Sequence, residues 1–394
     1  MATGASAITL PQDLTMTLSF SRLLAGCLVL CTPWALAADG VSPRQILIGQ
    51  NITLQGGKND YGKAVQDGIQ TYLQAVNARG GVNGRQVVLQ TLDDDNQSAK
   101  AEANARQLVG QDKVFILFGS IEGGPSTAVM KAAVDLNVPF FGPIAGSPTL
   151  RRPHQPLVFP VRTEHREEFR ALLDYAKKTG TTRVAFVRSD SETGLQHLEN
   201  VRLLCRDLGM ELVADLPFKS DVSDVQMGQM AQRIAATNAQ VVINHGGAGV
   251  YERLIRQARK QGVRATFSGV NSGSTQLAKN LGELAHGMVF SQVVPSPWER
   301  KTGITREYQE EFARLKPGQE FSYGSLEGYL TAKALVAALR LAGNDPTRDS
   351  FVRGLHNAGS IDLNGLRASY LPGSHTGLTL VDLAIVTRDG KFRH

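Results

Sequence analysis

One stretch decides the fold: Val114-Phe115-Ile116-Leu117-Phe118-Gly119-Ser120-Ile121-Glu122-Gly123-Gly124-Pro125-Ser126-Thr127. Its first five residues are apolar and β-prone, which predicts a strand buried on both faces of a parallel sheet. The glycines that follow allow a tight loop, and Pro125 suits the first position of the helix that comes next. Strand, loop and helix N-terminus together predict a polar cradle with a positive end, suited to a carboxylate. An ordinary connection between a strand and a helix would have the same pattern.

Outward from this stretch, strands and helices alternate in two consecutive series, separated by a crossing segment at 158–162. The first series has strands at 46–51, 87–89, 114–118 and 138–141, and helices at 61–77, 99–109 and 128–136. The second has helices at 164–178, 195–208, 225–236 and 249–261, and strands at 184–187, 212–213, 241–243, 265–267 and 287–291. Two further helices, 304–315 and 324–341, precede a closing strand at 378–386. This order predicts an α/β protein of two doubly wound lobes, with ligand sites at the carboxyl ends of the strands.

The composition is that of a globular protein large enough for two domains: 394 residues, of which 42% are hydrophobic and 20% charged. The net charge is only +6. Its basic residues are scattered in pairs such as Arg151-Arg152 and Lys177-Lys178, as on solvated surfaces. We therefore expect no nucleic-acid partner.

The N-terminus predicts a signal peptide. Arg22 precedes the apolar run 23–36, and Ala35-Leu36-Ala37 has small residues where a signal peptidase reads them. The predicted cut follows Ala37, so residues 1–37 are removed and the mature protein is periplasmic. The translation start remains open between Met1 and Met16.

The cysteines fit an exported protein without an intramolecular disulfide. Leu24-Ala25-Gly26-Cys27 resembles a lipoprotein box, but the apolar segment before it is too short, so lipid anchoring at Cys27 is the less favoured alternative. Removal of the leader also removes Cys31 and leaves Cys205 alone, expected as a small buried hydrophobe.

Enzyme and metal motifs are missing from the sequence. There is no Gly-x-Ser-x-Gly elbow, no phosphate-binding loop with its Lys, and no dinucleotide fingerprint after the first strand. His165, His197 and His245 show no ligand spacing. For Asp93-Asp94-Asp95-Asn96, capping of the next helix is a better interpretation than a calcium loop. We therefore expect no enzyme activity, catalytic residue, metal or cofactor.

Several motifs, in order and spacing, resemble one family: the type I periplasmic binding proteins of ABC transporters, in the branch that binds leucine, isoleucine and valine. The similarity covers nearly all of 44–394. It rests on Tyr61-Gly62, Asn77-Ala78-Arg79-Gly80-Gly81-Val82-Asn83-Gly84, Leu92-Asp93-Asp94-Asp95, Gly119-Ser120, Phe141-Gly142-Pro143-Ile144-Ala145-Gly146-Ser147-Pro148, Leu254-Ile255-Arg256-Gln257-Ala258-Arg259-Lys260-Gln261-Gly262 and Tyr323-Gly324-Ser325-Leu326-Glu327-Gly328-Tyr329.

The resemblance implies two lobes joined by a three-crossing hinge, which close on a small ligand and deliver it to permease subunits in the inner membrane. Lobe I is expected at 44–162 plus 293–345, and lobe II at 163–292 plus 346–394. The protein is expected to be a monomer. Its function would be that of a solute-binding protein for an amino acid, amide or small organic acid. A ligand-sensing subunit of a signalling system, with the same clamshell, is the alternative.

The resemblance also implies a pocket, with some departures from the family pattern. Gly123 stands where the family has a hydroxyl, and Thr193 where it has an aromatic ring. Asn271 aligns with the acid that pairs with a ligand's ammonium group, so an aliphatic α-amino acid would be a poor ligand unless Glu122 or Asp190 replaces that acid. The expected lining is Tyr61, Ser120, Ile121, Glu122, Gly123, Ile144, Ala145, Gly146, Ser147, Arg188, Thr193, His245, Asn271 and Tyr323, in which Arg188 and His245 would meet an acidic group.

Overall fold

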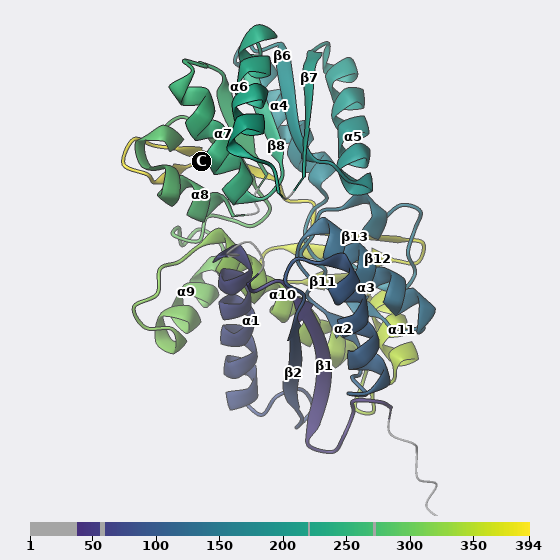
Figure 1. Cartoon of the computed structure of the whole chain (residues 1–394). Coiled ribbons are helices and arrows are strands. Elements are labelled where there is room, and N and C mark those ends of the chain that lie inside the picture. Colours follow the sequence, from purple (N-terminus) through teal and green to yellow (C-terminus); the bar gives the residue numbers. More distant parts are fainter. Residues whose placement is uncertain (1–37, 56–59, 220, 271–272) are drawn as a thin grey trace, which may run out of the picture. The chain divides into compact units, whose positions relative to one another are not determined.

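The computed structural model describes residues 38–55, 60–219, 221–270 and 273–394, and residues 37–394 form one compact unit (Figure 1). The predicted signal peptide and the Cys27 box lie outside the described residues, as does Asn271. Among the described helices, none combines the length and the apolar character that a membrane crossing requires.

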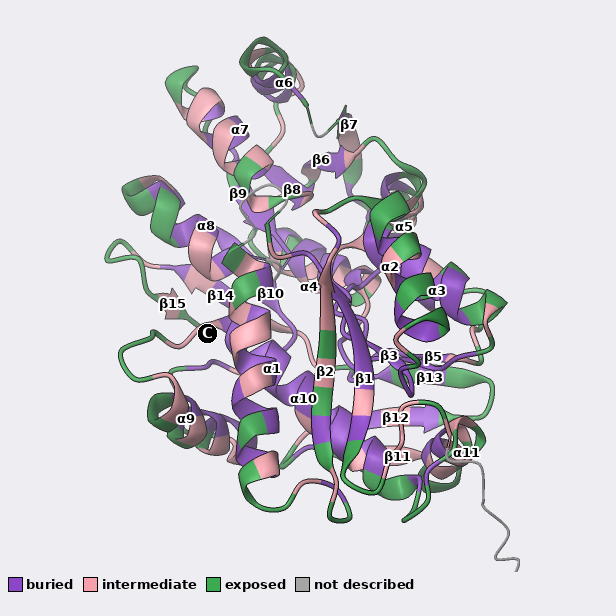
Figure 2. Cartoon of the chain, turned by 60° about the horizontal axis from the view of Figure 1, so that its bottom comes forward, coloured by how far each residue is buried: buried purple, intermediate pink, exposed green. Residues whose placement is uncertain are grey.

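The first lobe is built on a parallel sheet with the strand order β2-β1-β3-β4-β5. Its strands are β1 (Gln45–Ile52), β2 (Gln86–Asp93), β3 (Leu117–Phe118), β4 (Phe140–Phe141) and β5 (Val158–Phe159). One face packs against α1 (Asp60–Ala78), α9 (Gly303–Leu315) and α10 (Tyr323–Leu341), and the other against α2 (Ser98–Gly110) and α3 (Gly123–Asp135). Successive strand residues alternate between these two cores, as Ile46 and Leu47 do. Figure 2 shows the exposed positions of the edge strand β2 beside the more buried β1.

The second lobe has a larger sheet with the order β15-β14-β10-β9-β8-β6-β7. Its strands are β6 (Arg183–Ser189), β7 (Glu211–Phe218), β8 (Val241–His245), β9 (Thr266–Gly269), β10 (Val289–Gln292), β14 (Asp382–Val386) and β15 (Phe392–Arg393), of which β14 and β15 are antiparallel. One face is covered by α4 (His165–Lys178) and α5 (Glu192–Leu208), and the other by α6 (Asp224–Ala236), α7 (Ala248–Lys260) and α8 (Ser274–Leu281). The predicted fold of two doubly wound lobes is confirmed.

The C-terminal segment from residue 346 onward packs differently from the prediction, which assigned all of it to lobe II. The segment forms α11 (Arg348–Ala358), β11 (Ser360–Asp362), β12 (Arg367–Leu371) and β13 (Ser374–Gly377). The side chains of Phe351, Ile361 and Tyr370 are buried in the same hydrophobic core as the apolar side chains of α1 and α10. Only β14 and β15 join the second sheet. We therefore propose that lobe I also includes 346–378, and that the C-terminal part of lobe II is 379–394.

Helices α1 and α10 approach each other backbone to backbone. A β-carbon added to Gly68 would lie 1.8 Å from the Ser325 carbonyl oxygen, and one on Gly328 would lie 2.0 Å from the Val65 carbonyl oxygen. Only glycine fits at such contacts. The close packing brings the first turns of both helices together at the edge of the first lobe.

Three local predictions were wrong. Helix α3 begins at Gly123, which places Pro125 at its third position. The closing strand begins at Asp382, because Leu378 is part of the first lobe's core. The aspartates after β2 do not cap α2, whose N-cap is Gln97. Instead, Asp94 is buried and accepts hydrogen bonds from Asn51 Nδ2 and Thr53 Oγ1, at 2.6 and 2.5 Å.

Candidate functional site

The loops that follow β3 and β4 lie side by side at the carboxyl ends of their strands. Ile121 and Ile144 form a parallel bridge, and the Ile144 N–H donates to the Ser120 carbonyl at 2.7 Å. The Ser126 hydroxyl donates to the Ser120 hydroxyl at 3.2 Å. The structure therefore brings together the two predicted lining segments, 120–123 and 144–147.

The start of α3 has the backbone expected of a ligand cradle. Glu122 occupies the N-cap position with a φ of 63°, a left-handed conformation that is costly for a residue other than glycine. Such conformations cluster at ligand-binding sites. Gly123 and Gly124 then supply the first helical N–H groups, which lack intrahelical partners and suit an anion.

The second lobe faces this cradle with the first turn of α5. The Ser191 hydroxyl caps that helix by accepting from the Gly194 N–H at 3.1 Å. A β-carbon added to Gly123 would lie 3.2 Å from Thr193 Cγ2 and 3.9 Å from Ser147 Cβ. Residues 123, 147 and 193 therefore converge from both lobes, and a side chain at residue 123 would press against Thr193.

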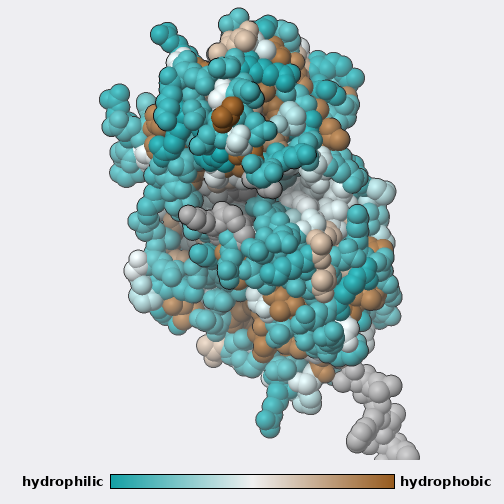
Figure 3. All heavy atoms as spheres, viewed as in Figure 1, coloured by the Kyte–Doolittle hydropathy of each residue, from teal (hydrophilic) through white to brown (hydrophobic). Residues whose placement is uncertain are grey.

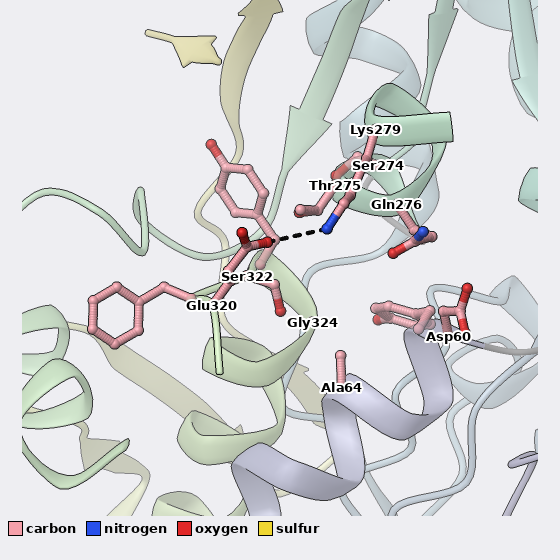
Figure 4. Close-up of a pocket in the computed structure, with 13 residues that line it drawn as sticks. Asp60, Ala64, Ser274, Thr275, Gln276, Lys279, Glu320, Ser322 and Gly324 are labelled. Atoms are coloured by element: carbon pink, nitrogen blue, oxygen red, sulfur yellow. Dashed lines mark hydrogen bonds and ion pairs between the residues drawn. The ribbon is translucent and has the colours of Figure 1, made fainter. Parts of the chain in front are cut away.

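A cavity of about 180 Å³ lies between α1, α8 and the first turn of α10 (Figure 4). Tyr61 and Tyr323 of the predicted lining border this cavity, whereas the other described residues of that lining do not. At its rim, Lys279 Nζ from the second lobe lies 3.3 Å from Glu320 Oε2 of the first lobe. Both side chains are largely exposed, at 68% and 83%. Nothing in the sequence around Lys279 or Glu320 indicated that these two side chains would pair across the lobes.

Tyr61 connects the cavity to a buried ionic network. Its hydroxyl donates to Glu327 Oε2 at 2.7 Å, and burial together with the Glu327 charge raises the pKa of Tyr61 well above its ordinary value. The hydroxyl is therefore a donor at every physiological pH. Its ring packs on Gly324, where an added β-carbon would lie 3.0 Å from Tyr61 Cδ2.

Arg162 is the centre of this network, at the crossing between the lobes. Its Nη2 donates to Glu168 Oε2 of α4 at 2.8 Å, and its Nη1 lies 3.5 Å from Glu327 Oε1 of α10. Ser291 on β10 donates to Glu168 Oε1 at 2.9 Å. Burial alone would lower the pKa of Arg162, but the two carboxylates outweigh it and raise that pKa. The network thus joins elements of both lobes through one buried cation.

The other predicted tyrosine, Tyr323, faces the C-terminus with its polar end. Its hydroxyl is 2.9 Å from His394 Nε2, and His394 Nδ1 lies 2.8 Å from Asp382 Oδ2. Its ring packs edge-on against Trp298, with the ring centroids 5.3 Å apart. The aromatic ring, with its hydroxyl engaged, is therefore the part that Tyr323 offers to the cavity.

Arg188 is engaged within its own lobe. Its Nε and Nη2 donate to the two carboxylate oxygens of Asp215 on β7, each at 2.8 Å. The side chain is 5% exposed. This geometry favours a structural ion pair between neighbouring strands, and contact of Arg188 with an acidic ligand stays a prediction. Asp190, considered as an ammonium partner, lines a separate groove beside β7 and α6.

His245 ends β8 and meets two histidines that the sequence analysis had set aside. Its ring centroid is 4.6 Å from that of His165, the first residue of α4, and 3.8 Å from that of His197 on α5. The spacing along the sequence did not reveal this group, which forms because α4 and α5 cover the same face of the sheet beside the end of β8. One signal was available: Thr193 and His197 are four residues apart, so they share a face of α5.

The loop after β4 packs against this histidine group at His165. A β-carbon on Gly146 would lie 2.6 Å from His165 Cγ, so glycine is required there. Arg151 Nη1 donates to the carbonyls of Ala145 and Ser147, at 3.3 and 3.2 Å, which holds the loop in place. The loop after β4 thus contacts His165, whose ring lies beside that of His245. Figure 3 shows a hollow in the surface between the two lobes.

Known proteins share this architecture. Residues 45–391 match the family described as periplasmic binding protein. The Leu/Ile/Val-binding protein homolog 2 of Brucella abortus (strain 2308) is 24% identical over 324 residues, which are 80% of this chain and 84% of that protein.

Two solved structures illustrate the similarity in fold. A possible leucine/isoleucine/valine-binding protein from Rhodopirellula baltica SH 1 has a TM-score of 0.83 and 23% identity, and the match covers 91% of this chain and 98% of that one. An ABC transporter solute-binding protein from R. palustris, in complex with benzoate, has a TM-score of 0.78 and 18% identity, with 89% and 95% covered.

Proposed function

The chain belongs to the periplasmic binding protein family, and from that premise we propose that it captures an amino acid, amide or small organic acid outside the cytoplasm and delivers it to the permease of an ABC importer. The solute would bind between the two lobes, and hinge closure would bury it. The protein binds its solute without catalysing a reaction of it.

The observation that carries this proposal is the convergence of the two lobes at residues 123, 147 and 193. Segments from β3, β4 and α5 meet there, although their sheets are separate. In α/β folds, ligands bind beyond the carboxyl ends of parallel strands. The site therefore lies where closure of the lobes would enclose a small molecule.

Within this solute class, a carboxylic acid fits best. The first turn of α3 offers N–H groups and a positive dipole end to a carboxylate. An ammonium group would need a buried negative partner, and the residue that aligns with the family's acid is the uncharged Asn271. The names of the relatives include both branched-chain amino acids and benzoate. We therefore rank aromatic and aliphatic acids above α-amino acids.

A thermal-shift screen tests the proposal. Leucine, glutamine, benzoate, 4-hydroxybenzoate and short aliphatic acids are added to the purified protein, and a ligand of the folded state raises the unfolding temperature with concentration. The Gly123→Leu variant should lose the shift, because its side chain fills the space facing Thr193. The matched variant Gly110→Leu should keep it, because a β-carbon there meets nothing within 4 Å. A solute that stabilises both variants equally would place binding elsewhere.

A further inference from the structure

Three histidines from three different elements converge beside the hinge. His165 begins α4, His197 lies in α5, and His245 ends β8. Each offers one ring nitrogen, and the three atoms lie within 4.8 Å of one another. Three nitrogens at 2.0–2.1 Å from one tetrahedral ion would be about 3.4 Å apart. Small rotations of the rings would therefore bring all three to bonding distance.

His197 is buried without the partners that a structural histidine normally has. Its side chain is fully enclosed, at 0% exposure. Within the described residues, neither of its ring nitrogens has a hydrogen-bond partner, and the same is true of His245 Nδ1. Buried polar atoms in native proteins nearly always have a hydrogen-bond partner, and a bound ion is one of the recognised explanations when they have none.

His165 already has the support that a metal ligand requires. Its Nδ1 lies 2.6 Å from Glu168 Oε2, so the Nδ1–H donates a hydrogen bond to the carboxylate and the free lone pair is on Nε2. Glu168 is held in turn by Arg162 and Ser291. A carboxylate behind a histidine fixes the ring and raises its basicity in known metal sites.

The charge state of the group also suits a metal. Burial is the main reason that the pKa of each histidine lies below its ordinary value, at about 4 for His245. Neutral imidazole is the form that binds metals. The guanidinium groups of Arg162 and Arg151 oppose a cation here, while the Glu168 carboxylate, between Arg162 and His165, offsets part of that repulsion.

We propose that His165, His197 and His245 form a binding site for a divalent transition-metal ion of the zinc type. Imidazole ligands favour zinc, copper and nickel over magnesium or calcium. His245 is the only partly exposed member of the three, whereas the other two are buried, so a fourth coordination position would open on the His245 side. The inference is independent of which solute the protein carries.

The test uses metal alone on protein purified without a histidine tag and stripped with a chelator. Zn²⁺ binding is measured by calorimetry, and Co²⁺ binding by the visible absorption of a tetrahedral site. We expect one ion per chain. His197→Phe keeps an aromatic ring against Phe169 and removes two nitrogens, so it should weaken Zn²⁺ binding more than about 100-fold, beyond the usual effect of an outer-shell change.

Two further variants make the result decisive. His245→Gln, at the partly exposed position, should also weaken binding, and it serves as the test if His197→Phe does not fold. His356→Gln is the matched control, because His356 belongs to another histidine pair, with its Nε2 2.9 Å from His375 Nε2. Unchanged affinity in His356→Gln supports the site. Failure of the wild type to bind Zn²⁺ or Co²⁺, equal affinity in His197→Phe, or loss only in His356→Gln would overturn it, whatever the solute screen shows.

Discussion

Replacing Arg162 by Met should destabilise the protein more than any surface ion-pair change. Arg162 is 1% exposed, and its two acidic partners, Glu168 and Glu327, are 0% and 1% exposed. Without the guanidinium, two buried carboxylates lose their shared cation. Removing one partner of a buried ion pair costs about 3–5 kcal/mol, because the remaining charge is neither paired nor hydrated. We expect Arg162→Met to lower the free energy of unfolding by about that amount near neutral pH.

The pH dependence separates this electrostatic loss from a packing defect. In general, a buried carboxylate that has lost its cation takes up a proton more readily in the folded chain than in the unfolded chain, where carboxyl groups titrate near about 4.3. The folded state then binds more protons in that window, and its stability rises as the pH falls. The difference between variant and wild type should therefore shrink on going from about pH 7.5 to about pH 5. A cavity left by the shorter side chain would cost the same at both pH values.

Urea denaturation, followed by circular dichroism at both pH values, measures the effect. Arg106→Met is the matched control, because Arg106 is 42% exposed and pairs with the exposed Glu102 and Asp135. It should cost far less than Arg162→Met, because ion pairs on the surface are screened by solvent. If Arg162→Met cost no more than this control, or if its cost did not depend on pH, the reasoning about the buried network would be refuted.

Three further changes follow from single contacts. Gly328→Ala should lower the free energy of unfolding, measured by urea denaturation, by about 1–3 kcal/mol or more, because the added carbon would lie 2.0 Å from the Val65 carbonyl oxygen. A loss below about 0.5 kcal/mol would contradict the close packing of α1 and α10. Burial lowers the pKa of His375 to about 4, while an unfolded histidine titrates near 6.5, so the unfolded state binds the extra proton and stability falls as the pH drops through this window. His375→Gln should flatten that slope in urea titrations at several pH values, and an unchanged slope would exclude His375 as its source. Lys279→Met should change the free energy of unfolding by less than about 1 kcal/mol, because both members of the Lys279–Glu320 pair are exposed, and a loss above about 2 kcal/mol would show that this rim contact is structural.

The periodicity of the sequence was enough to predict the fold. The run at 114–118 is fully buried between the cores on the two faces of the first sheet, as predicted, but only Leu117–Phe118 of the predicted strand form β3. The predicted helix at 164–178 differs from α4 by one residue. The lobe boundary at residue 346 was harder to predict, because it depends on which hydrophobic core contains Phe351 and Tyr370. The apolar character of a side chain does not show which core it joins.

Contacts between side chains from distant parts of the chain were harder to predict than the positions of the loops. The two lining loops were placed together correctly, because both follow neighbouring strands of a parallel sheet. Arg188 was considered a ligand contact, yet Asp215 on the next strand binds it, a pairing that depends on strand register. Sequence spacing could not bring His165, His197 and His245 together either, since the three lie on elements joined only by tertiary packing.

One carboxylate links the hinge to the histidine group. Glu168 neutralises Arg162 with the same oxygen, Oε2, that lies beside His165 Nδ1, at 2.8 and 2.6 Å respectively. A change at Glu168 would therefore disturb the buried ion pair and the orientation of His165 together, and its effect on stability could not be assigned to either. His197 contacts the group from α5 and, among the described residues, makes no hydrogen bond to Arg162 or Glu168. Substitution of His197 is therefore the change that separates metal binding from the electrostatics of the hinge.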